Sequence, residues 1–199
     1  MKEDLIQQQI LQAAQQLFQK HGYQKVTMDD IAKAIGKGRS SLYYYYKNKD
    51  EVFDAVMSAE IDDIMTEIDR AVGQAPDIEQ KLQAFANTRT KISKKKKAFF
   101  DALETGMNAD EISQYAQRKQ AVQRMIRKEE SILLNRVMDE AATKGEIVKL
   151  ATKEKENLLL VFTSGLRGLK REMWLENSYT RMEPASDLLV KMIMLAIKK

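Results

Sequence analysis

Three short helical patterns follow one another within residues 27–53, and they limit the possible folds more than any other feature of the sequence. Thr27 and Asp30 lie at the spacing at which a hydroxyl and a carboxylate cap each other's backbone N–H groups. The apolar residues that follow them recur at helical intervals. A helix is therefore predicted to begin at Met28, directly after its capping residue.

A tight turn and two more helices are predicted after this first helix. Gly36 and Gly38 interrupt the pattern, and glycine readily adopts the positive φ angles that tight turns require. A second helix is predicted over residues 39–46, and Asn48 with Glu51 repeats the capping arrangement before a third. Two short helices joined by a turn form a helix-turn-helix unit, whose second helix enters the major groove of DNA. The segment therefore predicts a DNA-binding domain.

Basic residues are concentrated in the same segment. From Lys33 to Lys49 the chain carries five basic residues and no acidic one, whereas the whole chain of 199 residues has a net charge of only +4. A local excess of positive charge is typical of a surface that faces phosphate groups. The charge thus favours double-stranded DNA as a partner and disfavours a helical interaction module that binds no DNA.

The sequence between residues 5 and 55 resembles the N-terminal domain of the TetR family of bacterial transcriptional regulators. The resemblance is carried by Phe18, Gly22, Tyr23, Thr27, Met28, Asp29, Asp30, Ile31, Ala32, Gly36 and the run from Leu42 to Lys49. It implies an all-α fold with a helix-turn-helix DNA-binding domain over residues 1–50. A larger helical domain for effector binding and dimerisation is expected over residues 51–199.

The resemblance also implies which residues contact DNA. Lys37 and Gly38 depart from the valine and serine that are common in the family, so an apolar peg and a possible helix cap are both missing. The operator sequence therefore cannot be inferred from relatives. Contacts to phosphate are implied for Thr27, Tyr43 and Lys49, and an approach to the bases for Lys37, Gly38, Arg39, Ser40, Ser41 and Tyr44.

The remainder of the chain is predicted to be helical. It has few helix breakers, since the whole sequence contains two prolines and eight glycines, and short alternating strand patterns are missing. The segment 110–144 reads as one long helix or as two with a kink. Helices are predicted over residues 3–20, 50–72, 78–92, 110–144, 152–173, with Thr152 as a cap, and 188–197 after Pro184.

A dimer interface is predicted on the last two helices. Gly165 and Gly168 each cost about 1 kcal/mol relative to alanine inside a helix, and close approach of another helix would offset that cost. The resemblance implies a four-helix bundle with a second copy, and a homodimer matches a palindromic operator. The predicted interface residues are Leu158, Phe162, Gly165, Leu166, Leu169, Leu189, Met192, Ile193 and Ala196.

The resemblance implies a repressor that a small, largely apolar effector releases from its operator. The candidate pocket residues are Phe85, Phe99, Phe100, Met107, Tyr115, Met125 and Phe162, although the simpler interpretation of each is a core residue. The alternative is a DNA-binding protein of the same fold without a small-molecule effector, which acts through protein partners or as an architectural factor.

Catalysis, metal binding and membrane insertion are not expected. His21 is the only histidine, cysteine is absent and there is no phosphate-binding loop, so we expect no catalytic site, no metal and no cofactor. The run Lys94 to Lys97 is expected to be a solvated helix edge or loop. The longest apolar run, residues 158–162, is too short to span a membrane, and the start does not resemble a signal peptide. A cytoplasmic, nucleoid-associated protein is expected.

Overall fold

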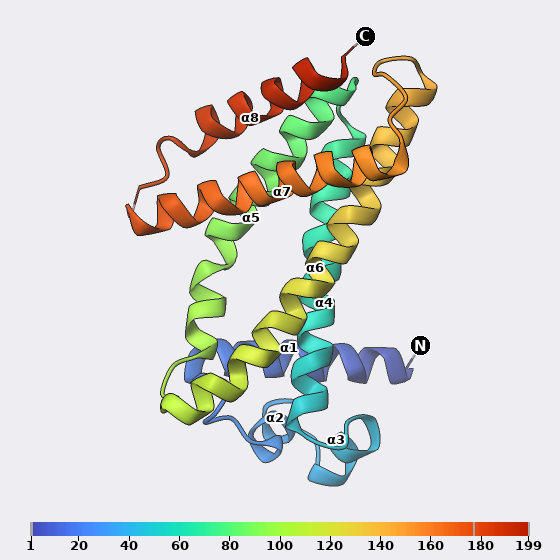
Figure 1. Cartoon of the computed structure of the whole chain (residues 1–199). Helices are drawn as coiled ribbons and strands as arrows, with labels where there is room; N and C mark the ends of the chain where they lie inside the picture. The colour runs from blue at the N-terminus through green and yellow to red at the C-terminus, as the bar shows by residue number, and fades with distance from the viewer. Residues whose placement is uncertain (1, 177, 199) are drawn as a thin grey trace. The chain divides into compact units, whose positions relative to one another are not determined.

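The computed structural model describes residues 2–176 and 178–198 (Figure 1). Within these residues the chain forms eight α-helices and no β-strand, which confirms the predicted all-α fold. An isolated β-bridge joins Ile147 and Lys198. The helices are α1 (Lys2–His21), α2 (Met28–Ala34), α3 (Arg39–Tyr45), α4 (Lys49–Gly73), α5 (Ile78–Leu103), α6 (Ala109–Thr143), α7 (Thr152–Leu175) and α8 (Met182–Ile197).

The chain divides into two compact units. Unit 1 comprises Met1–Asp63 and Lys95–Met125, and unit 2 comprises Ile64–Lys94 and Ile126–Lys199. The helices α4, α5 and α6 each contribute residues to both units. These units are defined by how the residues pack. They do not test the predicted extent of the DNA-binding domain, residues 1–50, which stays a prediction.

Aromatic rings form the centre of the core of unit 1. The predicted apolar stripe of α1 is buried through Ile10, Ala14 and Phe18, each with no exposed surface. The ring of Phe18 lies 5.9 Å from that of Phe53 on α4, and the ring of Tyr23 lies 4.8 Å from that of Phe53. These edge-to-face contacts fix α1 against the start of α4.

The end of α5 is held against the end of α1 by a close backbone approach. Gly22 has a φ angle of +80°, and a Cβ atom at this position would lie 2.5 Å from the carbonyl oxygen of Thr105. The next residue, Tyr23, donates its backbone N–H to the carbonyl of Leu103 at 3.2 Å. Glycine is therefore needed here both for its backbone conformation and for the space that a side chain would occupy.

Unit 2 has its own core, in which α7 and α8 lie side by side (Figure 1). The rings of Phe85 on α5 and Phe162 on α7 are 6.0 Å apart. A Cβ atom on Gly165 would lie 2.7 Å from Cδ2 of Leu189 on α8, so this glycine permits close packing of α7 and α8 within one chain. No atom lies within 4 Å of the corresponding position at Gly168.

The boundaries of three helices differ from the sequence-based expectation. The helix predicted over residues 78–92 continues as α5 to Leu103. Thr152 is the first residue of α7 rather than its cap: Ala151 occupies the capping position, and its backbone N–H donates to Glu154 at 2.9 Å. Pro184 lies inside the first turn of α8, where a missing backbone N–H costs nothing. Caps that depend on one hydroxyl are easily misplaced by one residue from sequence alone.

Candidate nucleic-acid interface

The predicted cap of α2 is present. The side chain of Thr27 accepts a hydrogen bond from the backbone N–H of Asp30 at 3.2 Å, and the carboxylate of Asp30 accepts one from the backbone N–H of Thr27 at 2.9 Å. The hydroxyl of Thr27 also donates to this carboxylate at 2.6 Å, and this bond, followed by the one from the backbone N–H of Thr27, lowers the pKa of Asp30. The start of the helix-turn-helix unit is therefore fixed by its own local sequence.

The turn between α2 and α3 has the positive φ angle that was predicted at Gly36, but Gly38 precedes α3 with a φ angle of −74°. Gly36 has a φ angle of +65° and donates its N–H to the carbonyl of Lys33 at 3.0 Å. Lys37 donates its N–H to the carbonyl of Ala32, also at 3.0 Å. This pair of bonds forms a Schellman motif, which ends α2 and directs the chain into α3.

One side of α3 is anchored in the core and the other faces solvent. Leu42 is fully buried, whereas Tyr43 and Tyr44 are 40% and 74% exposed. Tyr45 and Tyr46 are half-buried, and burial raises the pKa of Tyr46. The structure places eight of the nine predicted DNA-contacting residues at the surface: Thr27, Lys37, Gly38, Arg39, Ser40, Ser41, Tyr43 and Tyr44.

Arg39 is held in place by two neighbours at the start of α3. Its Nε atom lies 3.1 Å from a carboxylate oxygen of Asp29 on α2, and Nη2 donates to the hydroxyl of Tyr43 at 3.3 Å. The guanidinium also lies 5.4 Å from the centre of the Tyr43 ring. Asp29 was not among the predicted site residues, because its proximity to Arg39 arises only when α2 and α3 fold together.

Lys49, the ninth predicted residue, has a different environment. Its Nζ atom donates to the backbone carbonyls of Tyr23 and Gln24 at 3.0 and 3.1 Å and lies 4.4 Å from the centre of the Tyr23 ring. Burial lowers the pKa of Lys49. In this structure the ammonium group therefore joins the start of α4 to the connection between α1 and α2, and its contact with phosphate stays a prediction.

A second set of contacts joins α6 to the start of α4 within unit 1. The hydroxyl of Tyr23 donates to Asp50, and burial together with this bond raises the pKa of Tyr23. Arg118 of α6 lies 2.5 Å from Asp50 and 3.3 Å from Asp54. This network could not be predicted from the sequence, since nothing in the local pattern of α6 indicates that residues 95–125 pack with the helix-turn-helix unit.

The lysine run Lys94 to Lys97 lies within α5 and is only partly the solvated face that was expected. Lys95 is exposed, and Lys94 lies 4.6 Å from the ring centre of Tyr179. Lys96 is 23% exposed and lies 2.6 Å from the carboxylate of Glu60, which is buried on α4. The side chain of Lys96 therefore belongs to the interior of unit 1.

The predicted effector-pocket residues divide between the two units. Phe85 and Phe162 belong to the core of unit 2, and Met125 is 45% exposed. The other four, Phe99, Phe100, Met107 and Tyr115, belong to or pack against the core of unit 1. The structure thus does not bring the seven residues together around one cavity, and the proposed pocket stays a prediction.

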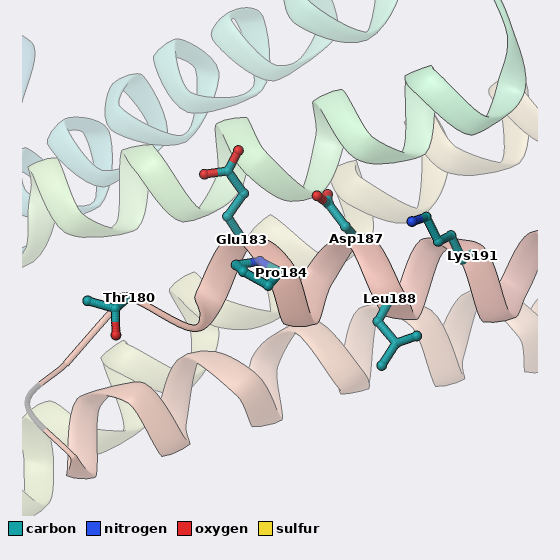
Figure 2. Close-up of a pocket in the computed structure, with 6 residues that line it drawn as sticks. All are labelled: Thr180, Glu183, Pro184, Asp187, Leu188 and Lys191. Carbon is teal, nitrogen blue, oxygen red and sulfur yellow. The ribbon is translucent and has the colours of Figure 1, made fainter.

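Two cavities on unit 2 are lined by other residues. One, of about 520 Å³, lies at the start of α8, where Figure 2 shows Glu183, Asp187 and Lys191 on one side of the helix and Leu188 on another. The second, of about 370 Å³, lies between α6 and the chain leading into α7 and includes Met138. Neither contains any of the predicted pocket residues.

The predicted interface residues on α7 and α8 have mixed environments in the single chain. Phe162, Leu166 and Ile193 are buried in the core of unit 2, at 1%, 1% and 6% exposure. Leu158, Gly165, Leu169 and Leu189 are half-buried, and Met192 and Ala196 are exposed. The large apolar side chains that are most exposed on these helices are Leu160, Val161, Trp174, Leu175, Leu188, Met192 and Leu195.

Residues 2–176 and 178–198 lack the features of two other classes of site. No group of three or more His, Cys, Asp or Glu side chains in this part of the chain is placed to hold a metal ion. No helix there has the length and apolar character needed to cross a membrane.

Sequence comparisons identify the N-terminal part of the chain. Residues 10–56 match the family described as bacterial regulatory proteins, tetR family. The chain is 30% identical over 96 residues to the transcriptional activator FasR of Mycolicibacterium smegmatis. The aligned region covers 48% of this chain and 39% of FasR. It is 43% identical over 44 residues to IcaR, the negative regulator of a biofilm operon in Staphylococcus epidermidis, covering 22% of this chain and 24% of IcaR.

These curated relatives are named as regulators of transcription, not as enzymes. The chain spans between 24% and 39% of the length of the curated relatives compared. The fold extends the similarity over the whole chain. A TetR-family transcription regulator from Marinobacter aquaeolei is 20% identical in sequence, and its structure superimposes with a TM-score of 0.59 over 100% of this chain and 98% of that one. Residues 10–56 therefore match the tetR-family model, and the whole chain shares the helical fold of a TetR-family regulator.

Proposed function

We propose that this protein regulates transcription by binding an operator through α3. The observation that supports this most directly is the structure of α3 itself, which is anchored by Leu42 and presents polar, basic and aromatic side chains to solvent. Such an anchored helix can enter the major groove without changing its fold. The proposed contacts to bases and phosphates come from Thr27, Lys37, Gly38, Arg39, Ser40, Ser41, Tyr43, Tyr44 and, after release from its carbonyl partners, Lys49.

The proposed active form is a homodimer joined through α7 and α8. Leu160 and Val161 are each 59% exposed on α7, and Leu188 and Leu195 on α8 are 59% and 86% exposed. Neighbouring exposed apolar side chains of this size indicate a surface that another protein covers. Gly168 supports the same assignment, because it has open space within the chain and would let a second helix approach closely.

In the proposed mechanism the dimer sets the distance between two α3 helices. Operator binding requires them to lie about 34–36 Å apart, one turn of DNA. An effector that binds more tightly to a form of the dimer with another distance weakens operator binding. A typical coupling free energy of about 1–3 kcal/mol corresponds to roughly 5- to 150-fold weaker binding to the operator. We propose repression as the sign of regulation; the named relatives include both an activator and a negative regulator.

Fluorescence anisotropy with a labelled mixed-sequence DNA duplex tests the DNA-binding surface. The wild-type protein is expected to bind with an affinity that falls steeply as salt rises, because bound lysines and arginines release counterions from phosphate. Lys37→Ala should reduce the slope of log affinity against log salt by about one. Lys153→Ala, an exposed position on α7, is the control and should leave the slope unchanged. A Lys37→Ala slope equal to that of the wild type would contradict the proposed surface.

A thermal-shift screen of small molecules tests the effector. Saturable stabilisation by a compound that also weakens operator binding is expected, since a ligand that binds only the folded state raises its stability. If every compound that stabilises the protein leaves operator binding unchanged, the alternative of a regulator that acts through protein partners is favoured instead.

A further inference from the structure

Unit 2 contains a buried carboxylate with only one of its two oxygen atoms in use. Glu130 on α6 is 2% exposed, and its Oε1 atom accepts a hydrogen bond from Nε of Arg89 on α5. No residue in the described part of the chain donates a hydrogen bond to Oε2, although this atom is also buried. A buried oxygen of a charged group is costly to leave without a donor, so this atom calls for an explanation.

Positive charge surrounds this carboxylate. Arg167 on α7 donates to Ser164 of its own helix at 2.7 Å and is half-buried. Burial lowers the pKa of Arg167, the positive charges of Arg89 and Arg127 lower it further, and the charge of Glu130 acts in the opposite direction. Three guanidinium groups therefore act on the same region as the carboxylate of Glu130, which accepts its hydrogen bond from Arg89.

Apolar side chains lie one helical turn from the ion pair of Arg89 and Glu130. Phe85 precedes Arg89 by four residues on α5, and Leu134 follows Glu130 by four residues on α6, so each pair shares a helix face. Phe85 and Leu134 are almost fully buried, and the ring of Phe85 lies 6.0 Å from that of Phe162 on α7. On α5 and on α6, a buried apolar side chain therefore lies one helical turn from the ion pair of Arg89 and Glu130.

We infer that Glu130 is the polar anchor of a ligand site between α5, α6 and α7 that takes an apolar molecule bearing a hydroxyl group. The hydroxyl donates its hydrogen bond to Oε2 of Glu130, and the apolar body of the molecule lies toward Phe85 and Phe162. This inference names the chemical class of the effector and therefore rests on the proposed function.

Other ligand chemistries fit the cluster less well. A cation would donate to Glu130, but it would be repelled by Arg89 and Arg167. A carboxylate would be attracted by these arginines, but it has no hydrogen to give and would place a second negative charge beside Oε2. A hydroxyl group is neutral and is both donor and acceptor, so it satisfies the buried oxygen without adding charge.

Calorimetric titration with three probes of similar size tests the inference: naphthol, methylnaphthalene and naphthoate. Naphthol is expected to bind the wild-type protein at least about tenfold more tightly than methylnaphthalene, the ratio expected for one hydrogen bond to a charged acceptor. Naphthoate should bind more weakly than naphthol. Equal binding of naphthol and methylnaphthalene, a preference for naphthoate, or no binding of any probe would overturn the inference, and would indicate that only water accompanies Glu130.

Two variants test whether Glu130 causes the difference in affinity between naphthol and methylnaphthalene. The double variant Arg89→Met/Glu130→Met replaces the ion pair with side chains of similar volume, so it should fold, and it should bind naphthol and methylnaphthalene with equal affinity. Glu60→Gln, at the other buried glutamate of the chain, is the control and should retain the tenfold ratio. A double variant that retained the ratio would overturn the inference.

The proposed function and this inference can fail separately. If the wild-type protein binds no duplex DNA but distinguishes naphthol from methylnaphthalene through Glu130, the ligand site stands and DNA regulation does not. If the protein binds DNA and shows no such discrimination, the inference about Glu130 alone is wrong.

Discussion

Among the residues whose burial is described, each of the two compact units buries one glutamate, and the two have different surroundings. In unit 1, Glu60 uses both carboxylate oxygens: Oε1 accepts from Gln15 of α1, and Oε2 accepts from Lys96 of α5 at 2.6 Å. In unit 2, Glu130 uses only Oε1, which accepts from Arg89. A carboxylate with all its partners stabilises its own unit, whereas one with a buried unused oxygen is an expected place for something that binds.

The two units also differ in the side chains that they expose to solvent. Unit 1 presents α3 with polar and aromatic groups, and its buried oxygen without a hydrogen-bond donor, Oδ1 of Asp29, lies 3.1 Å from Nε of Arg39 in the same unit. Unit 2 exposes large apolar side chains on α7 and α8 and leaves Gly168 open. The oxygen of Asp29 therefore has an ionic partner within unit 1, whereas unit 2 has a surface and an atom that we propose a second copy and a ligand cover.

The largest effect is expected from charge on the exposed face of α8. Leu188→Glu with Leu195→Glu would bury two carboxylates in the proposed dimer interface, which should weaken self-association by about a thousandfold, or about 4 kcal/mol. Sedimentation velocity measures this. Leu5→Glu, at a leucine of unit 1 that is 55% exposed, is the matched control and should associate normally. A Leu188→Glu/Leu195→Glu variant that still sediments as a dimer would show that the interface lies elsewhere.

The two buried ion pairs should respond differently to removal. Glu60→Met with Lys96→Met should lower the free energy of unfolding by about 2 kcal/mol, because Gln15 also loses its partner. Arg89→Met with Glu130→Met should change it by less than about 1 kcal/mol or raise it, since an incompletely bonded buried pair contributes little. Urea denaturation gives both values. Equal losses in the two variants would remove the distinction between the units.

Arg39→Ala tests whether a DNA-contacting side chain of unit 1 can be removed without a loss of stability. Removing this exposed side chain should reduce discrimination between operator and mutated operator by about 1–3 kcal/mol. The free energy of unfolding should change by less than about 0.5 kcal/mol, since the pairing with Asp29 is exposed. Binding to a set of single-base operator variants measures the first quantity, and an unaltered preference at every base would contradict the role given to Arg39.

The smallest effect is expected at the two glycines of α7. In the monomeric background Leu188→Glu/Leu195→Glu, Gly168→Ala should raise the free energy of unfolding by about 1 kcal/mol through helix propensity. Gly165→Ala should gain less or lose stability, because its Cβ would lie 2.7 Å from Leu189. In the dimer, Gly168→Ala should weaken association. Unchanged association would indicate that no second helix approaches this position.

Local features were the ones that sequence reasoning could predict. The cap at Thr27, the positive φ angle of Gly36 and the burial of α1 every fourth residue depend on neighbours along the chain, and each is present. Helix propensity and the scarcity of glycine and proline were enough for the all-α fold. The helix-turn-helix surface could be predicted because it is made of one continuous segment.

Features that depend on contacts between distant segments could not be predicted. Lys49 was expected to face phosphate, yet its partners are carbonyls 25 and 26 residues earlier in the chain. Gly165 was assigned to a second subunit, and its close neighbour is Leu189 of the same chain. Glu130 received no role, because nothing in the pattern of α6 shows that one of its oxygen atoms lacks a donor.

Selection of bound fragments from a random DNA library tests the central claim most directly, because it examines α3, the dimer and their spacing together. Two inverted copies of one short sequence, with centres about one turn of DNA apart, are the predicted result. The spacing should be lost with Leu188→Glu/Leu195→Glu, and the sequence of each half should change with Arg39→Ala. Enrichment of no sequence, or of the same sequence by the wild type and by Arg39→Ala, would contradict the account.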